Sequence, residues 1–65
     1  MKFIYFNGSY WNLEHISVIR FKQDRFEMFG NNGIDFQMSG SDYTKREIPF
    51  AEFLISEQVI FDLEA

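Results

Sequence analysis

Apolar and polar residues alternate most regularly at residues 34–38, where the chain reads Ile-Asp-Phe-Gln-Met. Successive side chains of a strand point to opposite faces of a sheet, so a period of two indicates a strand with one buried face. We therefore expect Ile34, Phe36 and Met38 to face the core, and Asp35 and Gln37 to face water.

Three other segments are rich in β-branched and aromatic residues and are also predicted to be strands: residues 2–6, 16–22 and 25–29. Within residues 16–22 the alternation changes phase, because Ile16 and Val18 share one face whereas Ile19 and Phe21 share the other. A β-bulge explains this change, and so does burial of both faces of the strand.

Short polar segments between these strands predict turns at residues 7–9, 23–24 and 39–42. Residues 31–33 read Asn-Asn-Gly between two apolar segments. An Asn-Gly pair in that setting is a strong hairpin signal, because a type I′ turn needs positive φ at both central residues. The sequence therefore predicts a hairpin with a type I′ turn at Asn32-Gly33, in which Phe26 and Met28 of the preceding strand face the core.

A short helical turn is predicted after Asn12. Its side chain is a good N-cap, and Leu13 and Ile16 are spaced to face inward from the same turn. So short a segment is not stable as a helix of its own.

Two helix starts compete in the C-terminal part of the chain. Residues 44–47 match a capping box, which would begin a helix at Thr44, but Pro49 argues against a helix that begins there. We expect extended residues before Pro49 and a helix that begins at Pro49, with Phe50, Phe53 and Leu54 buried.

Residues 59–63 are rich in β-branched and apolar side chains and are predicted to be a last strand, with a continued helix as the alternative. The whole pattern predicts one small α+β domain over residues 1–65. It consists of an antiparallel β-meander of about four strands, one short C-terminal helix packed on it, and residues 59–63 as a final edge strand.

Composition adds that this small domain depends on aromatic packing. Nine Phe, three Tyr and one Trp stand among 65 residues, and there is no Cys. A domain of this size buries a thin core, and without disulfides it needs dense aromatic packing or self-association to stay folded.

The net charge is −4, from six Lys and Arg against ten Asp and Glu. An acidic surface repels phosphate, which disfavours nucleic acid as a partner. The first apolar stretch is far shorter than a signal-peptide core or a membrane span, so we expect a cytoplasmic protein with no membrane partner.

Candidate catalytic and metal-binding residues do not form a recognisable motif. His15 is the one imidazole, and no Ser lies in a Gly-flanked nucleophile elbow. Oxygen-bearing residues between Asp35 and Asp42 do not follow the spacing of a calcium loop, and no phosphate-binding Gly pattern is present. We therefore expect no enzyme activity, no cofactor and no metal.

Basic and aromatic residues interleave at Arg20, Phe21, Lys22 and Arg25. Sheet surfaces use such patterns to stack unpaired bases, so these four are the candidates for single-stranded nucleic-acid binding. The competing interpretation is a buried aromatic beside solvated cations, which the acidic net charge favours.

The positions of Ser9, Asn12, Leu13 and Ile16, followed by Asn32-Gly33 and Ser39, resemble the strand spacing of LytTR-type response-regulator DNA-binding domains over residues 3–42. The resemblance implies a β-rich meander. No site residue is carried over from it.

The aromatic residues left outside the clean core alternation indicate the function. Tyr10, Trp11, Phe29 and Phe61 lie off that alternation or at element ends, and exposed aromatics are typical of interface centres. The leading hypothesis is a non-enzymatic module that self-associates or binds a protein partner through these four residues.

The alternative is an acidic inhibitor of a nucleic-acid enzyme, of the kind that phages and mobile elements encode. It would act by phosphate mimicry, because the chain carries only acidic charges after Arg46.

Overall fold

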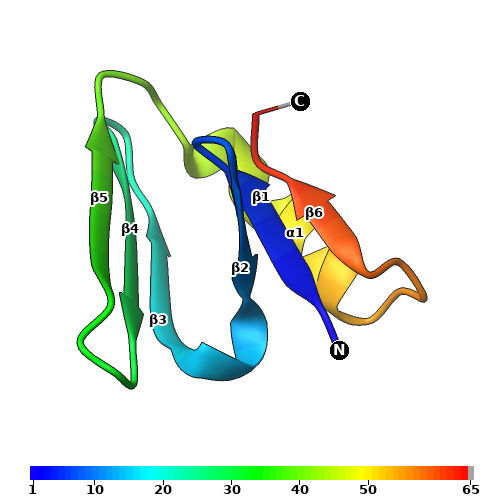
Figure 1. The fold of residues 1–65 in the computed structure, drawn as a ribbon. Helices are drawn as coiled ribbons and strands as arrows, with labels where there is room; N and C mark the ends of the chain where they lie inside the picture. The colour runs from blue at the N-terminus through cyan, green and yellow to red at the C-terminus, as the bar shows by residue number, and fades with distance from the viewer. Residues whose placement is uncertain (65) are drawn as a thin grey trace.

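The computed structural model describes residues 1–64, which form six strands, one α-helix and two 3₁₀ helices (Figure 1). The elements follow one another as β1 (Phe3–Phe6), β2 (Ser9–Asn12), η1 (Leu13–His15), β3 (Ile16–Phe21), β4 (Arg25–Gly30), β5 (Asp35–Ser39), η2 (Thr44–Arg46), α1 (Glu47–Leu54) and β6 (Ile60–Asp62). The predicted α+β class is confirmed, with one short C-terminal helix and a last strand at the edge of a sheet. The strands divide between two three-stranded sheets.

Sheet A has the strand order β2-β1-β6. The β1–β2 hairpin is joined by Asn7 and Gly8, whose φ values are 53° and 76°. Positive φ at both central residues is the requirement of a type I′ turn. On its other side β1 pairs with β6 in parallel, with Phe3 opposite Ile60, so sheet A departs from a purely antiparallel meander.

Sheet B is the antiparallel meander β3-β4-β5. The hairpin predicted around residues 31–33 is confirmed, but the type I′ turn at Asn32-Gly33 is wrong. Gly33 has φ 77°, whereas Asn7 is the non-glycine residue with positive φ in the described part of the chain. The Gly30 N–H donates to the Ile34 carbonyl at 2.8 Å across a three-residue loop, in which a left-handed glycine at the third position is common.

Of the two explanations for the change of phase in residues 16–22, the β-bulge is confirmed. The expectation that Ile16 and Val18 share one face is wrong, because Ile16 packs against the core whereas Val18 is 38% exposed. The β3–β4 register shifts between Ile16 and Val18, which leaves Ser17 as the extra residue. The helical turn after Asn12 is also confirmed, because its side-chain oxygen accepts from the Glu14 N–H at 2.9 Å. These two features turn the chain from sheet A into sheet B.

Helical structure begins earlier than predicted. Residues 44–48 are helical rather than extended, and Pro49 is the third residue of α1, where an N–H would have no partner in the helix. Just before this segment, Asp42 Oδ1 accepts from both the N–H and the hydroxyl of Thr44, at 2.9 and 2.6 Å. Phe50 and Phe53 are buried as predicted, whereas the expected burial of Leu54 is wrong, since it is 47% exposed.

The core lies between the two sheets and α1. Its buried members are Ile4, Phe6, Phe26, Met28, Phe50, Phe53 and Leu63. Phe6 of sheet A contacts two rings of sheet B, with centroids 5.1 Å from Phe26 and 4.5 Å from Phe36. Ile34, Phe36 and Met38 are half-buried, with Asp35 and Gln37 exposed as the alternation predicted.

Candidate functional site

The outer face of sheet A carries aromatic and aliphatic side chains. Ile4 and Phe6 are fully buried, so the alternation along β1 directs Phe3 and Tyr5 to the opposite, solvent-facing side. The register places Tyr10 of β2 opposite Tyr5, and Ile60 of β6 opposite Phe3. We call these four residues, Phe3, Tyr5, Tyr10 and Ile60, the aromatic face.

Two tyrosines of the aromatic face contact each other, Tyr5 on the central strand β1 and Tyr10 on the edge strand β2. The rings of Tyr5 and Tyr10 are 4.8 Å apart at 52° to each other, and Tyr10 is 62% exposed. On the other edge strand, β6, Ile60 lies opposite Phe3 and is 45% exposed, and Asp62 lies opposite Tyr5. Solvent-facing positions of a sheet are usually polar, so this surface is suited to contact with another molecule.

Of the four predicted partner-binding residues, only Tyr10 belongs to the aromatic face. Trp11 is half-buried on the inner side of sheet A, where its ring lies 5.3 Å from Phe36 and its Nε1–H donates to the Phe6 carbonyl at 3.3 Å. The expectation that Trp11 lies outside the core is therefore wrong.

Phe61 also packs against the core, with ring centroids 5.2 Å from Phe50 and 5.5 Å from Phe53. Phe29 lies apart on sheet B, under the guanidinium of Arg20 at 5.7 Å from its ring centroid. The structure therefore does not bring the four predicted residues together.

Phe3, Tyr5 and Ile60 were not among the predicted site residues. The alternation in residues 3–6 was visible in the sequence, but it does not say which face of the strand is covered. That choice depends on α1, which lies behind sheet A in Figure 1, and on sheet B, whose Phe26 and Phe36 contact Phe6.

The predicted nucleic-acid residues separate onto the two faces of sheet B. Phe21 faces the core, between Phe26 and Phe50 at ring distances of 5.4 Å each. The three cations Arg20, Lys22 and Arg25 lie on the outer face. Phe21 is therefore not placed beside them for stacking on a base.

Those three cations surround Glu27, which is only 6% exposed. Arg25 Nε donates to Glu27 Oε2 at 3.0 Å, while Arg20 Nη1 and Lys22 Nζ lie 3.6 and 3.9 Å from Oε1. The hydrogen bond from Arg25 is the main cause that holds the pKa of Glu27 below its ordinary value. The three cations are therefore arranged around the buried carboxylate of Glu27.

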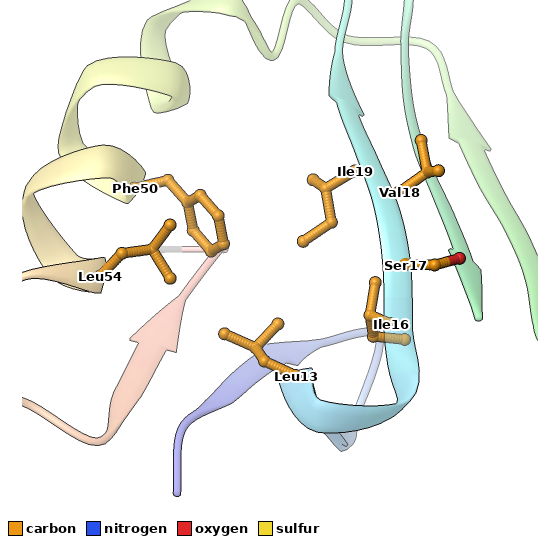
Figure 2. A pocket seen from close by; sticks show the side chains of 7 residues that line it. All are labelled: Leu13, Ile16, Ser17, Val18, Ile19, Phe50 and Leu54. Carbon is orange, nitrogen blue, oxygen red and sulfur yellow. The ribbon is translucent and has the colours of Figure 1, made fainter. Parts of the chain in front are cut away.

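A groove separates strand β3 from helix α1 (Figure 2). It has a volume of about 240 Å³, and the side chains that project into it are Leu13, Ile16, Ile19, Phe50 and Leu54. Ser17 and Val18 also line it, but Figure 2 shows their side chains pointing away from α1. We call this feature the β3–α1 groove.

Three of the five acidic residues after Arg46 lie on different sides of sheet A. Asp62 is on the outer face of sheet A, whereas Glu47 and Glu52 are carried by α1, which packs on the inner side. This distribution does not favour phosphate mimicry, which needs one continuous acidic surface.

The described residues show few features of a catalytic or metal site. His15 is exposed, and residues 1–64 contain no cluster of three His, Cys, Asp or Glu side chains placed to hold a metal ion. The Asp42 carboxylate accepts hydrogen bonds from Thr44, and these bonds lower the pKa of Asp42. Within the same residues, no helix combines the length and the hydropathy needed to cross a bilayer.

No protein-family model, curated protein or solved structure matches the chain.

Proposed function

We propose that the protein is a non-enzymatic interaction module whose aromatic face binds a protein partner or a second copy of the chain. The observation that carries this proposal is the pair of contacting tyrosines, Tyr5 and Tyr10, on the solvent side of sheet A. Tyrosine combines a large apolar ring with a hydroxyl that can hydrogen-bond, which is why it is enriched in protein interfaces.

The size of the face favours a partner that reaches beyond it. Three strands of three or four residues give a surface well below the ~800 Å² that each side of a stable interface buries. The free edge of β6 adjoins the face and extends it with unpaired backbone groups. A bound protein would cover both the aromatic face and this edge.

Site-specific crosslinking tests the proposal. Tyr10 is replaced by the photoreactive p-benzoylphenylalanine in the full chain, which is expressed in its source cells and irradiated. We expect a covalent adduct with a protein, because Tyr10 is part of the aromatic face and is 62% exposed. An adduct of two chains shows self-association, and an adduct with another protein shows a distinct partner.

The matched control places the same photoreactive residue at Gln37, which is exposed on the outer face of sheet B. Equal adduct yields at Tyr10 and Gln37, or no adduct at Tyr10, would contradict the proposal. The predicted positions Trp11, Phe29 and Phe61 provide a further comparison. Trp11 and Phe61 pack against the core and are expected to crosslink less than Tyr10.

A further inference from the structure

The β3–α1 groove is an apolar surface separate from the aromatic face. It is lined on the α1 side by Phe50 and Leu54, and Leu54 remains 47% exposed. Exposed aliphatic side chains next to a hollow are the usual setting of a binding site.

The size of the groove indicates what it accepts. Pockets for small-molecule ligands commonly measure ~300–1,000 Å³, and this groove of about 240 Å³ is smaller and open. It has room for one bulky apolar side chain. In protein interfaces, a single side chain in such a pocket often contributes most of the binding energy.

The backbone beside the groove favours an extended partner. β3 is an edge strand of sheet B, and the Lys22 N–H donates to the Arg25 carbonyl at 2.9 Å. Hydrogen-bonded and non-hydrogen-bonded pairs alternate along an antiparallel ladder, so the backbone N–H and C=O of Arg20 face β4, as those of Lys22 do. The N–H and C=O of Ile19, one residue earlier, therefore face the free edge of β3. An added strand would pair with those groups.

The charges around the groove select the sign of the partner. Glu47 lies three and seven residues before Phe50 and Leu54, on the same side of α1, and Glu14 follows Leu13 at the other end of the groove. The lining residues themselves carry no charge, and the nearby Lys2 ammonium is engaged by the carbonyls at the end of α1, so the two carboxylates and the net charge of −4 set the sign. A cationic segment is therefore attracted and an anionic one repelled.

We infer that the β3–α1 groove binds an extended protein segment that inserts one bulky apolar side chain and carries Lys or Arg beside it.

Peptide selection on the full chain tests this inference. A random twelve-residue displayed library is selected on the immobilised protein, with subtraction on a Leu54→Asp variant. We expect the enriched sequences to combine a bulky apolar residue with neighbouring Lys or Arg. The most enriched peptide is then synthesised, and its Kd is measured by fluorescence anisotropy.

Matched variants locate the site. Leu54→Asp should weaken binding at least about tenfold, since it puts a charge into the apolar groove. Ile55→Asp alters the adjacent, more exposed residue outside the groove lining and should stay within about twofold of the wild type. Glu47→Gln should weaken binding about twofold to fivefold, whereas Glu52→Gln should not.

Three results would overturn the inference: no enrichment over the subtraction, enriched peptides without Lys or Arg, or equal loss in Leu54→Asp and Ile55→Asp. Circular dichroism of each variant checks that it is folded. Tyr10→Ser should leave peptide binding unchanged, so failure of this site and failure of the aromatic face are distinguishable.

Discussion

At the residue scale, Lys2 links the start of the chain to the end of α1. Its ammonium donates to the carbonyls of Phe53 at 3.0 Å and Ser56 at 2.8 Å, and also to that of Gln58. The same ammonium lies 4.4 Å from the centroid of the Phe53 ring. A cation at a helix C-terminus binds carbonyls that have no partner within the helix and interacts favourably with the helix dipole.

Replacing Lys2 by Ala is expected to lower the free energy of unfolding by about 1 to 2 kcal/mol, because carbonyls at the end of α1, two of them in part-buried hydrogen bonds, lose a charged donor. Urea unfolding followed by circular dichroism measures this. Lys45→Ala, which removes an exposed lysine of η2, serves as the control and should change stability by less than ~0.5 kcal/mol. Equal effects of the two substitutions would show that Lys2 does not act as a cap.

At the element scale, Gly30 allows η1 to approach the end of the β4–β5 hairpin closely. The Asn31 N–H donates to the His15 carbonyl at 2.9 Å. A Cβ at position 30 would lie 2.5 Å from that carbonyl oxygen and 2.8 Å from Cβ of Ile34. Nothing in the sequence around residue 30 indicates this contact, since His15 is fifteen positions away.

Gly30→Ala should therefore destabilise the protein by about 1 to 3 kcal/mol, because backbone on one side and a packed side chain on the other leave no room for a methyl group. Gly33→Asn is the matched control. It has open space around its Cβ position, and Asn tolerates the positive φ found there. Thermal unfolding compares the two, and a Gly30→Ala protein as stable as the wild type would contradict the close contact.

At the scale of the whole molecule, the two sheets share one core. Phe6 contacts Phe26 and Phe36 across the boundary, and Trp11 of sheet A adds a further contact with Phe36. A core of so few residues does not leave either sheet with enough buried area to be stable alone.

We therefore expect both sheets to unfold in a single transition. Trp11 fluorescence reports on the contact between the two sheets and far-ultraviolet circular dichroism reports on all strands, so their denaturation midpoints should coincide. Phe6→Leu should lower the free energy of unfolding by about 1 to 3 kcal/mol and should therefore shift both midpoints to lower denaturant concentration by the same amount. Two separate midpoints would show that the sheets fold independently.

Local patterns in the sequence determined most of the secondary structure. The alternation at residues 34–38, the Asn12 cap and the last strand all depend on neighbouring residues, and the structure confirms each of them. For the change of phase in residues 16–22 the sequence left two explanations, and the structure shows the bulge. Turn chemistry was less clear. Both Asn7-Gly8 and Asn32-Gly33 have residue types that suit a type I′ turn. Strand register leaves two residues in the first loop and three in the second, so only Asn7-Gly8 forms that turn in the described part of the chain.

Only the tertiary structure decided which faces of the strands are buried and which aromatic residues meet. Period two in residues 3–6 is the same whether Ile4 or Tyr5 points inward, and packing of α1 and sheet B on one side made the choice. The parallel pairing of β1 with β6 likewise joins residues almost sixty positions apart. The aromatic face and the β3–α1 groove both arise from such long-range packing, which local sequence patterns do not encode.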